Sequence, residues 1–278
     1  MQIVTALKQG KQQLVSSDSA RLDAELLLCA TLKCDRTKLY THPEQEISIE
    51  ELNDFNKLIT QRAAGHPIAY LTENKEFWSL SFTVSRDTLI PRPDTEILVE
   101  SALPLIPDQT ASNILELGTG SGAIAIAIAS ERDRANITAT DICQKALNIA
   151  KENAASNKIE NIKFIKADWF DIADIKTYDL IISNPPYICK DDPHLCQGDV
   201  QFEPITALAA GEDGLDDIRH IIQHGHQYLN SQAWLLLEHG YNQADQVRQL
   251  FNDNGYAIST TIEDYNGIER VSMGQRLD

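Results

Sequence analysis

Hydrophobic residues near the start of the chain recur with the spacing of a helix face. Ser17 or Asp18 can cap the N-terminus of this first helix, because both side chains accept hydrogen bonds from free backbone amides. The predicted apolar face consists of Leu22, Leu26, Leu27 and Ala30. We therefore expect an amphipathic helix with this face turned toward a core.

A second helix is predicted to begin at Ser48. The run Ser48-Ile49-Glu50-Glu51 fits the S-x-x-E capping box, in which the first and last side chains each bond the other's backbone amide. The apolar positions that follow a helical period are Ile49, Leu52, Phe55, Leu58 and Ile59. Gly65-His66-Pro67 ends the helix, so residues 1–66 are predicted to form a small helical domain.

The pattern changes over residues 67–93. Phe77, Leu80, Phe82 and Val84 lie among polar residues, which indicates a β-hairpin or extended connecting region. Asp94 can cap a helix that opens a larger domain, predicted to span residues 94–278.

Within that domain, short apolar runs alternate with helical patterns. The predicted strands are residues 114–117, 137–140, 162–165, 180–183 and 234–238, with a terminal pair near 257–262 and 270–273. The predicted helices are residues 123–130, 144–157, 215–229 and 242–254. This alternation predicts an α/β fold with a parallel, doubly wound sheet, and the last two strands predict an antiparallel hairpin at one edge.

A glycine-rich loop joins the first strand of this sheet to its helix. It consists of Gly118, Thr119, Gly120, Ser121 and Gly122. Glycines let the backbone turn tightly and approach a ligand at the carboxyl end of a strand, where open α/β sheets bind. With Ala123 the loop also satisfies the dinucleotide pattern G-x-G-x-x-G/A, so a nicotinamide enzyme and an ordinary glycine turn both stay open at this point.

Two further strand ends favour a nucleoside ligand. Asp141 ends the second strand, where its carboxylate can accept hydrogen bonds from ribose hydroxyls, although it can equally cap the following helix. Trp169 follows the third strand, where an indole ring can stack on adenine or simply belong to the core.

The run Asn184-Pro185-Pro186-Tyr187 follows the fourth strand, which is expected to lie beside the first. Two prolines fix φ and remove two amide donors, so nearby carbonyls are held without internal partners. Together with the Asn184 amide oxygen and the flat face of Tyr187, these carbonyls are predicted to form a binding site for a planar –NH2 group. Because an amide nitrogen is a poor nucleophile, accepting its hydrogens while aligning it with a methyl donor suits methyl transfer. The chemistry of a nicotinamide enzyme does not require this run of residues, so the run favours methyl transfer.

Composition and charge limit the classes of substrate that the protein can act on. The 278 residues are 42% hydrophobic and 23% charged, as in a globular protein that can bury a core. With 24 Lys and Arg against 41 Asp and Glu, the net charge is −17, and no basic cluster is present to contact nucleic-acid phosphates. No signal-peptide pattern or membrane-spanning run is evident, so we expect a soluble cytoplasmic protein.

Five scattered cysteines argue against a disulfide framework. Cys189, His194 and Cys196 lie close in sequence, but no paired C-x-x-C elements accompany them. We expect no metal.

Several segments in order resemble the HemK-type protein-(glutamine-N5) methyltransferases, which act on peptide chain release factors. The resemblance covers nearly the whole chain. It rests on residues 89–96, the 117–122 loop, Asp168-Trp169-Phe170, residues 184–187, Gln197-Gly198-Asp199-Val200, Phe202-Glu203-Pro204 and residues 235–240. It implies a class I, Rossmann-like, seven-stranded S-adenosylmethionine-dependent methyltransferase behind an N-terminal helical domain that helps recognise the release factor.

The resemblance also implies roles for single residues. The residues expected at S-adenosyl-L-methionine, and at its product S-adenosyl-L-homocysteine, are Gly118, Thr119, Gly120, Ser121, Gly122, Asp141, Trp169 and Asn184. Residues 184–187 would hold the glutamine of the Gly-Gly-Gln motif of class I release factors, with effects on translation termination. Arg92 and Glu96 would lie near the cofactor pocket. Glu116 stands where family members often carry Asp, and little effect is expected.

Three alternative functions remain. A paralogous enzyme that methylates a large-subunit ribosomal protein shares the Asn-Pro-Pro-Tyr run, but Pro93-Asp94-Thr95-Glu96 fits the release-factor group. Adenine-N6 methylation of nucleic acid uses the same kind of binding site, and the charge argues against it. A non-enzymatic docking protein on this scaffold is the third. No membrane or nucleic-acid partner is expected.

Overall fold

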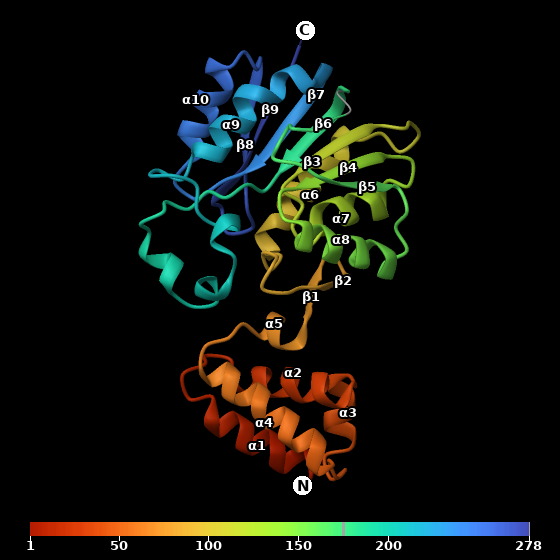
Figure 1. Ribbon diagram of the computed structural model, residues 1–278, viewed down its shortest axis with the longest axis vertical. Coiled ribbons are helices and arrows are strands. Elements are labelled where there is room, and N and C mark those ends of the chain that lie inside the picture. The colour runs from red at the N-terminus through yellow and green to blue at the C-terminus, as the bar shows by residue number, and fades with distance from the viewer. Residues whose placement is uncertain (174–175, 278) are drawn as a thin grey trace. The chain divides into compact units, whose positions relative to one another are not determined.

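The computed structural model describes residues 1–173 and 176–277. Its chain divides into two compact units (Figure 1). The first unit comprises Met1–Asn74 with Gln197–Phe202, and the second comprises Lys75–Cys196 with Glu203–Asp278. The domain boundaries at residues 66 and 93 stay predictions.

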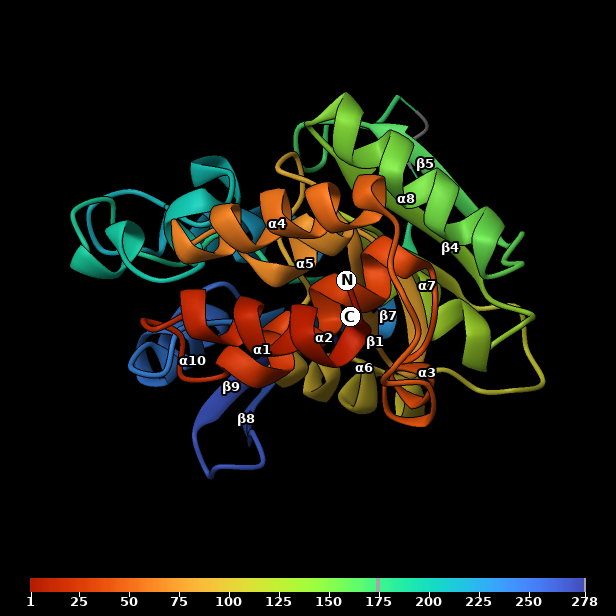
Figure 2. The ribbon, with the colours of Figure 1, turned by 90° about the horizontal axis from the view of Figure 1, so that it is seen from below.

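The first unit is helical. Its helices are α1 (Ile3–Gln13), α2 (Ala20–Leu32), α3 (Arg36–Thr41), α4 (Ile49–Ala63) and α5 (Ile68–Thr72), with the 3₁₀ turn η4 (Val200–Phe202). Helices α1, α2 and α4 lie side by side (Figure 2). Ile3, Leu27, Leu28, Phe55 and Ile59 are buried between them.

The capping box at the start of α4 is confirmed. The Ser48 amide donates to Glu51 Oε2 at 2.8 Å, and the Glu51 amide donates to Ser48 Oγ at 3.1 Å. The helix ends at Ala63, just before Gly65. Ile49, which was predicted on the apolar face, is 81% exposed because it is the first residue of the helix.

The prediction for α2 is wrong in its cap and in part of its face, since Leu27 is buried as predicted but Leu22 is not. Ser19 holds the N-cap position without a side-chain cap bond, while the Ser17 hydroxyl donates to Asp23 Oδ2 at 2.8 Å. Leu22 is 41% exposed, whereas Asp23 and Glu25 are buried. The face is rotated because ion pairs make burial of these two carboxylates tolerable.

Those ion pairs join α2 to its neighbours. Arg62 of α4 donates to Asp23 Oδ2 at 2.7 Å, and Arg36 of α3 donates to Glu25 Oε2 at 2.6 Å. Long-range partners of this kind leave no mark in the local hydrophobic pattern.

The predicted hairpin is confirmed. Strand β1 (Asn74–Phe77) and strand β2 (Leu80–Thr83) pair as a two-stranded sheet. Trp78 and Ser79 between them have φ of 53° and 56°, as a two-residue type I′ turn requires. Glu96 Oε1 accepts from the Trp78 amide at 2.8 Å and holds this turn.

The prediction that Asp94 caps a helix is wrong. Residues Pro93–Thr95 form a 3₁₀ turn (η1), and α6 (Glu96–Ala102) begins after Thr95 without a side-chain cap bond. Proline can occupy the first position of such a turn because its missing amide is not needed there.

The seven-stranded sheet confirms the predicted α/β fold. Its strands are β3 (Asn113–Leu117), β4 (Asn136–Asp141), β5 (Ile162–Lys166), β6 (Tyr178–Ser183), β7 (Leu229–Glu238), β8 (Ile258–Glu263) and β9 (Glu269–Gln275). They are ordered β5-β4-β3-β6-β7-β9-β8. All pairs from β5 to β7 are parallel, and β9 runs antiparallel to both its neighbours. The predicted antiparallel hairpin at one edge is therefore confirmed.

Helices cover both faces of the sheet (Figure 1). Helices α6, α7 (Ala123–Glu131) and α8 (Gln144–Ser156) lie on one face, and α9 (Asp216–Gly225) and α10 (Ala244–Asp253) lie on the other. Adjacent strand residues point to opposite cores: Ile114 and Ile182 to the first, Leu115 and Ile181 to the second. The remaining 3₁₀ turns are η2 (Leu103–Leu105), η3 (Pro193–Cys196), η5 (Ile205–Ala207) and η6 (His226–Tyr228).

The order of the strands reverses between β3 and β6. From β3 the chain proceeds outward through β4 and β5, and then returns to place β6 on the other side of β3. In open α/β sheets a crevice forms at the carboxyl ends of strands where the winding reverses, and ligands bind there. The glycine-rich loop follows β3 and residues 184–187 follow β6, so the fold brings both to this crevice.

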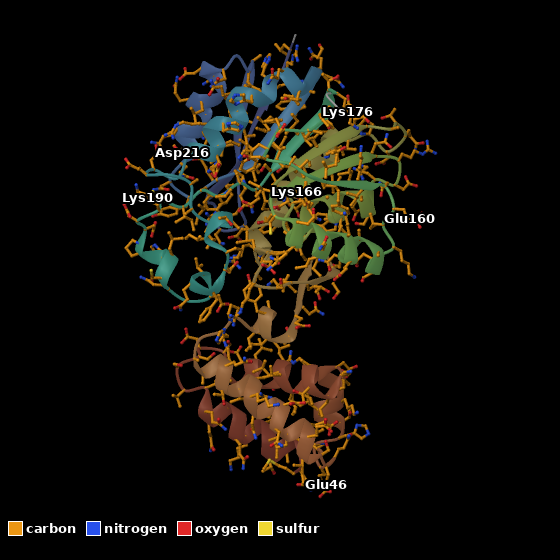
Figure 3. All side chains as sticks on the ribbon, viewed as in Figure 1. Glu46, Glu160, Lys166, Lys176, Lys190 and Asp216 are labelled. Carbon is orange, nitrogen blue, oxygen red and sulfur yellow. The ribbon has the colours of Figure 1, made fainter. Side chains whose placement is uncertain are left out.

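Charged side chains lie on the outside of both units, as Glu46, Glu160, Lys190 and Asp216 illustrate (Figure 3). Along the described part of the chain, no helix is long and apolar enough to cross a membrane.

Candidate active site

The glycine-rich loop turns sharply from β3 into α7. A Cβ added at Gly122, whose φ is 84°, would lie 2.9 Å from Ile126 Cδ1 and 3.1 Å from Ala150 Cβ. Gly122 thus lets α7 approach α8. Gly120 has a φ of 55°, and a Cβ added there would meet nothing within 4 Å. Its bare backbone therefore faces open space, as a ligand cradle requires.

Glu116, the penultimate residue of β3 before this loop, is buried. The Thr119 hydroxyl donates to its Oε2 at 2.5 Å, while Oε1 has no hydrogen-bond partner among the described residues. Burial raises the pKa of Glu116 to about 8, and the Thr119 hydrogen bond opposes that rise. The carboxyl supports the loop from below the cavity.

Asp141 ends β4 and also supports the loop. Its Oδ2 accepts from the Gly120 amide and its Oδ1 from the Cys143 amide, both at 2.8 Å. Burial raises the pKa of Asp141, against these two hydrogen bonds. Each carboxylate oxygen can accept more than one hydrogen bond, so Asp141 keeps the capacity to accept a ligand hydroxyl.

Trp169 lies against the start of the same loop. A Cβ added at Gly118 would be 3.6 Å from Trp169 Cζ3, so the indole ring packs over the Gly118 backbone. Trp169 itself has a φ of 45°, which is uncommon for a residue with a large side chain. Backbone strain of this kind often accompanies a side chain that must face a ligand.

Asn184 is held from the opposite side of the crevice. Its Nδ2 donates to the Thr95 hydroxyl at 3.2 Å, and no described residue hydrogen-bonds its Oδ1. Burial raises the pKa of the Glu238 carboxyl at the end of β7. Asn184 is therefore tied to η1, 89 residues earlier in the chain.

Tyr187 is oriented by two polar contacts. Its hydroxyl donates to Glu238 Oε1 at 3.1 Å, and its backbone carbonyl accepts from Gln243 Nε2 at 3.0 Å. Burial, followed by the charge of Glu238, raises the pKa of Tyr187 above its usual range. The prediction that nearby carbonyls lack internal partners is thus wrong for Tyr187, because Gln243 from beyond β7 reaches it.

A buried carboxylate holds Arg92, which lines the crevice. Glu203 is buried and accepts from the Ile90 amide at 3.0 Å and from the Arg92 guanidinium. The Arg92 Nη1 also donates to the Ile90 carbonyl at 3.1 Å. Glu203 therefore ties the segment before η1 to the segment that enters η5.

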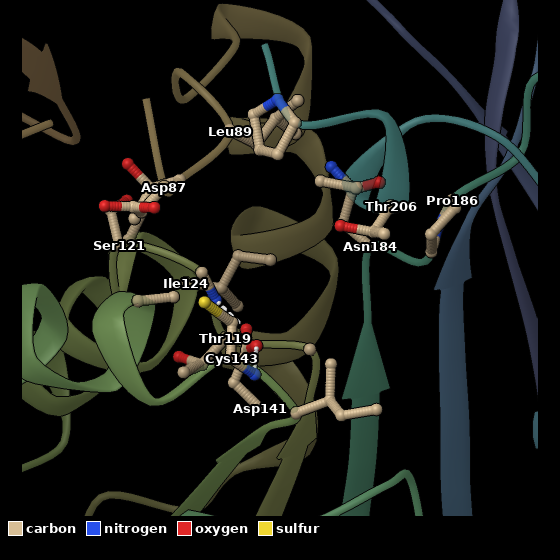
Figure 4. A pocket seen from close by; sticks show the side chains of 18 of the residues that line it. Asp87, Leu89, Thr119, Ser121, Ile124, Asp141, Cys143, Asn184, Pro186 and Thr206 are labelled. Atoms are coloured by element: carbon tan, nitrogen blue, oxygen red, sulfur yellow. Dashed lines mark hydrogen bonds between the residues drawn. The ribbon is translucent and has the colours of Figure 1, made fainter. Parts of the chain in front are cut away.

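These segments enclose a cavity of about 500 Å³ (Figure 4). In Figure 4, Thr119, Asp141 and Cys143 lie together on one side, and Asn184, Pro186 and Thr206 on another. Of the residues predicted for the site, those that line the cavity are Gly118, Thr119, Gly120, Ser121, Asp141, Trp169, Asn184 and Pro186. Gly122, Pro185 and Tyr187 are not among its lining residues. Arg92 lines it, whereas Glu96 holds the Trp78 turn instead.

Sequence reasoning missed several residues of this cavity. Thr95, Thr206 and Ala207 line it, and Glu203 positions Arg92, which also does. Glu238 and Gln243 position Tyr187, which follows the lining residues Asn184 and Pro186 in the chain. Glu203 and Glu238 occur in the Phe-Glu-Pro and Leu-Glu-His-Gly segments, where a glutamate inside an apolar run was the available signal. Thr95 lies in the 89–96 segment that carries the family resemblance, but no role was predicted for it.

No group of three or more metal-ligating side chains is found within residues 1–173 and 176–277. His194 Nδ1 contacts Asp192 Oδ1 at 2.7 Å on the surface. All five cysteines are free thiols.

Comparison with known proteins defines the class. Residues 93–196 match a methyltransferase small domain, and residues 5–72 match the PrmC N-terminal domain. A methyltransferase from Pyrococcus furiosus aligns with a TM-score of 0.55 at 18% identity, over 80% of this chain and 98% of that one, which supports the fold alone. The sheet order, the loop after β3 and these matches define a Rossmann-like methyltransferase.

Two relatives narrow the class to a family. The release factor glutamine methyltransferase of Aliivibrio fischeri is 48% identical, over 99% of this chain and 98% of its own length. That of Pseudomonas aeruginosa is 46% identical, over 98% of both chains. The chain belongs to the release factor glutamine methyltransferase family, and the predicted resemblance is confirmed.

Proposed function

We propose that this protein transfers a methyl group from S-adenosyl-L-methionine to the N5 amide nitrogen of the glutamine in the Gly-Gly-Gln motif of class I peptide chain release factors, and thereby modulates translation termination. S-adenosyl-L-homocysteine is the second product. The observation that carries the proposal is that one cavity is lined both by the glycine-rich loop and by Asn184, whose amide oxygen has no partner among the described residues.

The residues around the glycine-rich loop fit the methyl donor. The open space at Gly120 admits a ligand against bare backbone, and Asp141 keeps acceptor capacity for ribose hydroxyls. Trp169 offers an aromatic face, and Asp168 and Asp217 add negative charge to a cavity that would hold a cation. When bound there, the cofactor supplies a methyl group on a positively charged sulfur.

The residues after β6 fit a planar amide. With Nδ2 committed to Thr95, the Oδ1 of Asn184 is the atom left to accept a hydrogen from the substrate –NH2 group. Pro185 and Pro186 hold the backbone at this point and limit its motion. Orienting the nitrogen toward the methyl donor supplies much of the acceleration expected for a weak nucleophile.

The hydrogen bond to Asn184 also acts on the transition state. As the nitrogen becomes cationic its hydrogens become stronger donors, so a fixed acceptor stabilises the transition state more than the ground state. The proton can leave after the nitrogen is methylated, and this route needs no strong base.

Incubation with methyl-labelled S-adenosylmethionine tests the proposal. We expect label on an intact class I release factor and none on the same factor with Gln replaced by Ala in Gly-Gly-Gln. Equal labelling of both factors would overturn the assignment of the glutamine.

The same assay separates the rival substrates. Large-subunit ribosomal protein and adenine-containing nucleic acid are offered in parallel at equal concentration. Preferential labelling of either one would replace the release factor as substrate. No transfer to any of them, with cofactor binding intact, would favour a docking role.

A further inference from the structure

A hollow of about 370 Å³ lies within the helical unit, and it shares no lining residue with the cavity at the glycine-rich loop. We call it the helical-unit groove. One face of α1, with residues at the spacing i, i+3, i+4 and i+7, forms one wall, and α2, α3 and the segment after α3 form the rest. The lining residues are Val4, Leu7, Lys8, Lys11, Arg21, Glu25, Leu39, Tyr40 and Pro43.

The apolar part of the groove is exposed and held in a fixed shape. Val4 is 50% exposed and Tyr40 is 51% exposed. The Tyr40 hydroxyl donates to Glu25 Oε1 at 2.5 Å and accepts from Arg21 Nη2 at 3.0 Å. Glu25 is itself held by Arg36, whose Nη2 donates to Oε2 at 2.6 Å. The tyrosine ring is therefore presented in one orientation, which lowers the entropic cost of binding a partner against it.

The charged part of the groove is positive, although the protein as a whole is strongly acidic. Residues 1–43 contain 6 Lys and Arg against 4 Asp and Glu, whereas residues 44–278 contain 18 against 37. The net charge is therefore +2 in the first stretch and −19 in the second. Lys8 and Lys11 have no ion-pair partner within residues 1–173 and 176–277. Two unpaired cations beside exposed apolar side chains are complementary to an acidic partner.

The mixture of groups favours a protein segment over a nucleic acid. A nucleic acid is held by cations that follow its phosphates, whereas the cations here surround an apolar hollow. A hollow of this size admits an apolar side chain, and the lysines can pair with carboxylates that flank it.

We propose that the helical-unit groove is a docking surface for an acidic segment of the release factor. The segment places an apolar side chain between Val4 and Tyr40 and its carboxylates against Lys8 and Lys11. The inference rests on the proposed function, because it takes that factor as the substrate. The Gly-Gly-Gln motif offers only one side chain to an enzyme, since its glycines have none. A second contact outside the motif lets the enzyme discriminate the factor from other proteins that contain the same three residues.

Neutralising the two lysines tests the charged part of the groove. For Lys8→Gln/Lys11→Gln we expect KM for the release factor to rise about tenfold at low ionic strength, because electrostatic steering of association is weakened. The kcat at saturating factor should stay within about twofold, since the methyl-transfer site is unchanged. The difference in KM should disappear above roughly 0.5 M salt, where exposed charges are screened.

Lys151→Gln/Lys163→Gln is the matched control, because it removes the same charge from exposed positions on α8 and β5. Calorimetric cofactor binding and thermal unfolding should be the same in both double variants and in the parent protein. A fold defect would change these two measurements, whereas a lost docking contact would not.

Val4→Gln tests the apolar part of the groove. Glutamine has the higher helix propensity, so α1 is retained while apolar surface is lost. We expect KM for the factor to rise about fivefold, and this rise should persist at high salt because it does not depend on charge. Val15→Gln is the control, since Val15 is 88% exposed and does not line the groove.

The outcomes separate the two proposals. If the parent protein labels no release factor, the proposed function and the docking surface both fail. If the parent protein is active but Lys8→Gln/Lys11→Gln behaves like its control, only the docking surface is overturned. An unchanged KM with an altered oligomeric state, measured by light scattering, would assign the groove to a second copy of this chain. An unchanged KM with weaker binding of tRNA would assign it to nucleic acid, and either result would overturn the proposal.

Discussion

The two loops that face each other across the cavity are built by different means. The loop after β3 is shaped by its own glycines and is supported by Glu116 and Asp141, which bond atoms of the loop directly. The loop after β6 is stiffened by prolines. Its Asn184 and Tyr187 side chains bond Thr95 and Glu238, and its Tyr187 carbonyl accepts from Gln243. The first loop presents backbone to a ligand, and the second presents a single amide group whose orientation decides what it can bind.

This difference has a chemical reason. A cofactor with several polar groups can be held by many weak contacts, so no one contact has to be placed accurately. A transferable methyl group demands one nitrogen in one place, and a misplacement of about 1 Å can cost roughly 100-fold in rate. Side chains held by long-range hydrogen bonds provide that accuracy.

The largest effect is expected at the second loop. Asn184→Ala removes the acceptor for the substrate amide, and we expect kcat to fall about 10²–10³-fold, as for loss of one transition-state donor or acceptor. Cofactor affinity should fall less than tenfold, because the glycine-rich loop remains. Single-turnover methylation and calorimetric cofactor binding measure the two quantities. Asn254→Ala, at the end of α10, is the control, and equal loss in both variants would refute the comparison.

Glu116 tests the first loop through the pH dependence of stability. Its pKa in the folded protein is about 8, against an ordinary value of 4.5. The unfolded chain therefore loses this proton first, and the group's contribution to stability declines as pH rises from about 4.5 to about 8. Glu116→Gln removes this decline and should stabilise the protein above pH 8 by on the order of 5 kcal/mol.

Urea unfolding at a series of pH values measures this difference. The curves of the parent protein and Glu116→Gln should converge toward pH 4.5 and separate above it. Parallel curves over the whole range would show that Glu116 is ionised in the folded protein.

Glycine replacements test the backbone of the first loop. Gly122→Ala places a Cβ against Ile126 and Ala150 at a φ of 84°, so we expect a loss of about 1–3 kcal/mol in unfolding free energy. Gly120→Ala meets no neighbour and should cost about 1 kcal/mol. Its Cβ enters the cavity, so it should weaken cofactor binding more than stability. A larger loss of unfolding free energy in Gly120→Ala than in Gly122→Ala would contradict the assigned roles. So would weaker cofactor binding in Gly122→Ala than in Gly120→Ala.

The smallest effect is expected at Gln243. It bonds the Tyr187 carbonyl and also accepts from the Gly240 amide at 2.7 Å. Gln243→Ala should cost about 1–2 kcal/mol of stability, because two backbone groups lose their partner. A several-fold fall in kcat without a change in cofactor affinity would accompany it, and Gln249→Ala on the outer face of α10 is the matched control.

Periodicity predicted much of the fold. All seven strands of the main sheet, the hairpin and the capping box of α4 were confirmed, because these features depend on residues within one segment. The face of α2 was predicted wrongly in part because Asp23 and Glu25 are buried and pair with Arg62, Arg36 and Arg21. Asp94 failed as a cap because the preceding prolines continue into a 3₁₀ turn.

For the site, the sequence by itself determined the chemical types that are present. The sequence predicted the glycine loop, the acidic residue at a strand end and the run Asn184-Pro185-Pro186-Tyr187. These were predictable because their local conformations follow from their own side chains. Only the tertiary structure decided that Pro186 and Asn184 line the cavity while Pro185 and Tyr187 do not. It also decided which atom of Asn184 is left free, because that depends on Thr95, which lies 89 residues away along the chain. Hydrogen-bond direction is a property of the partners, and partners are assembled only by folding.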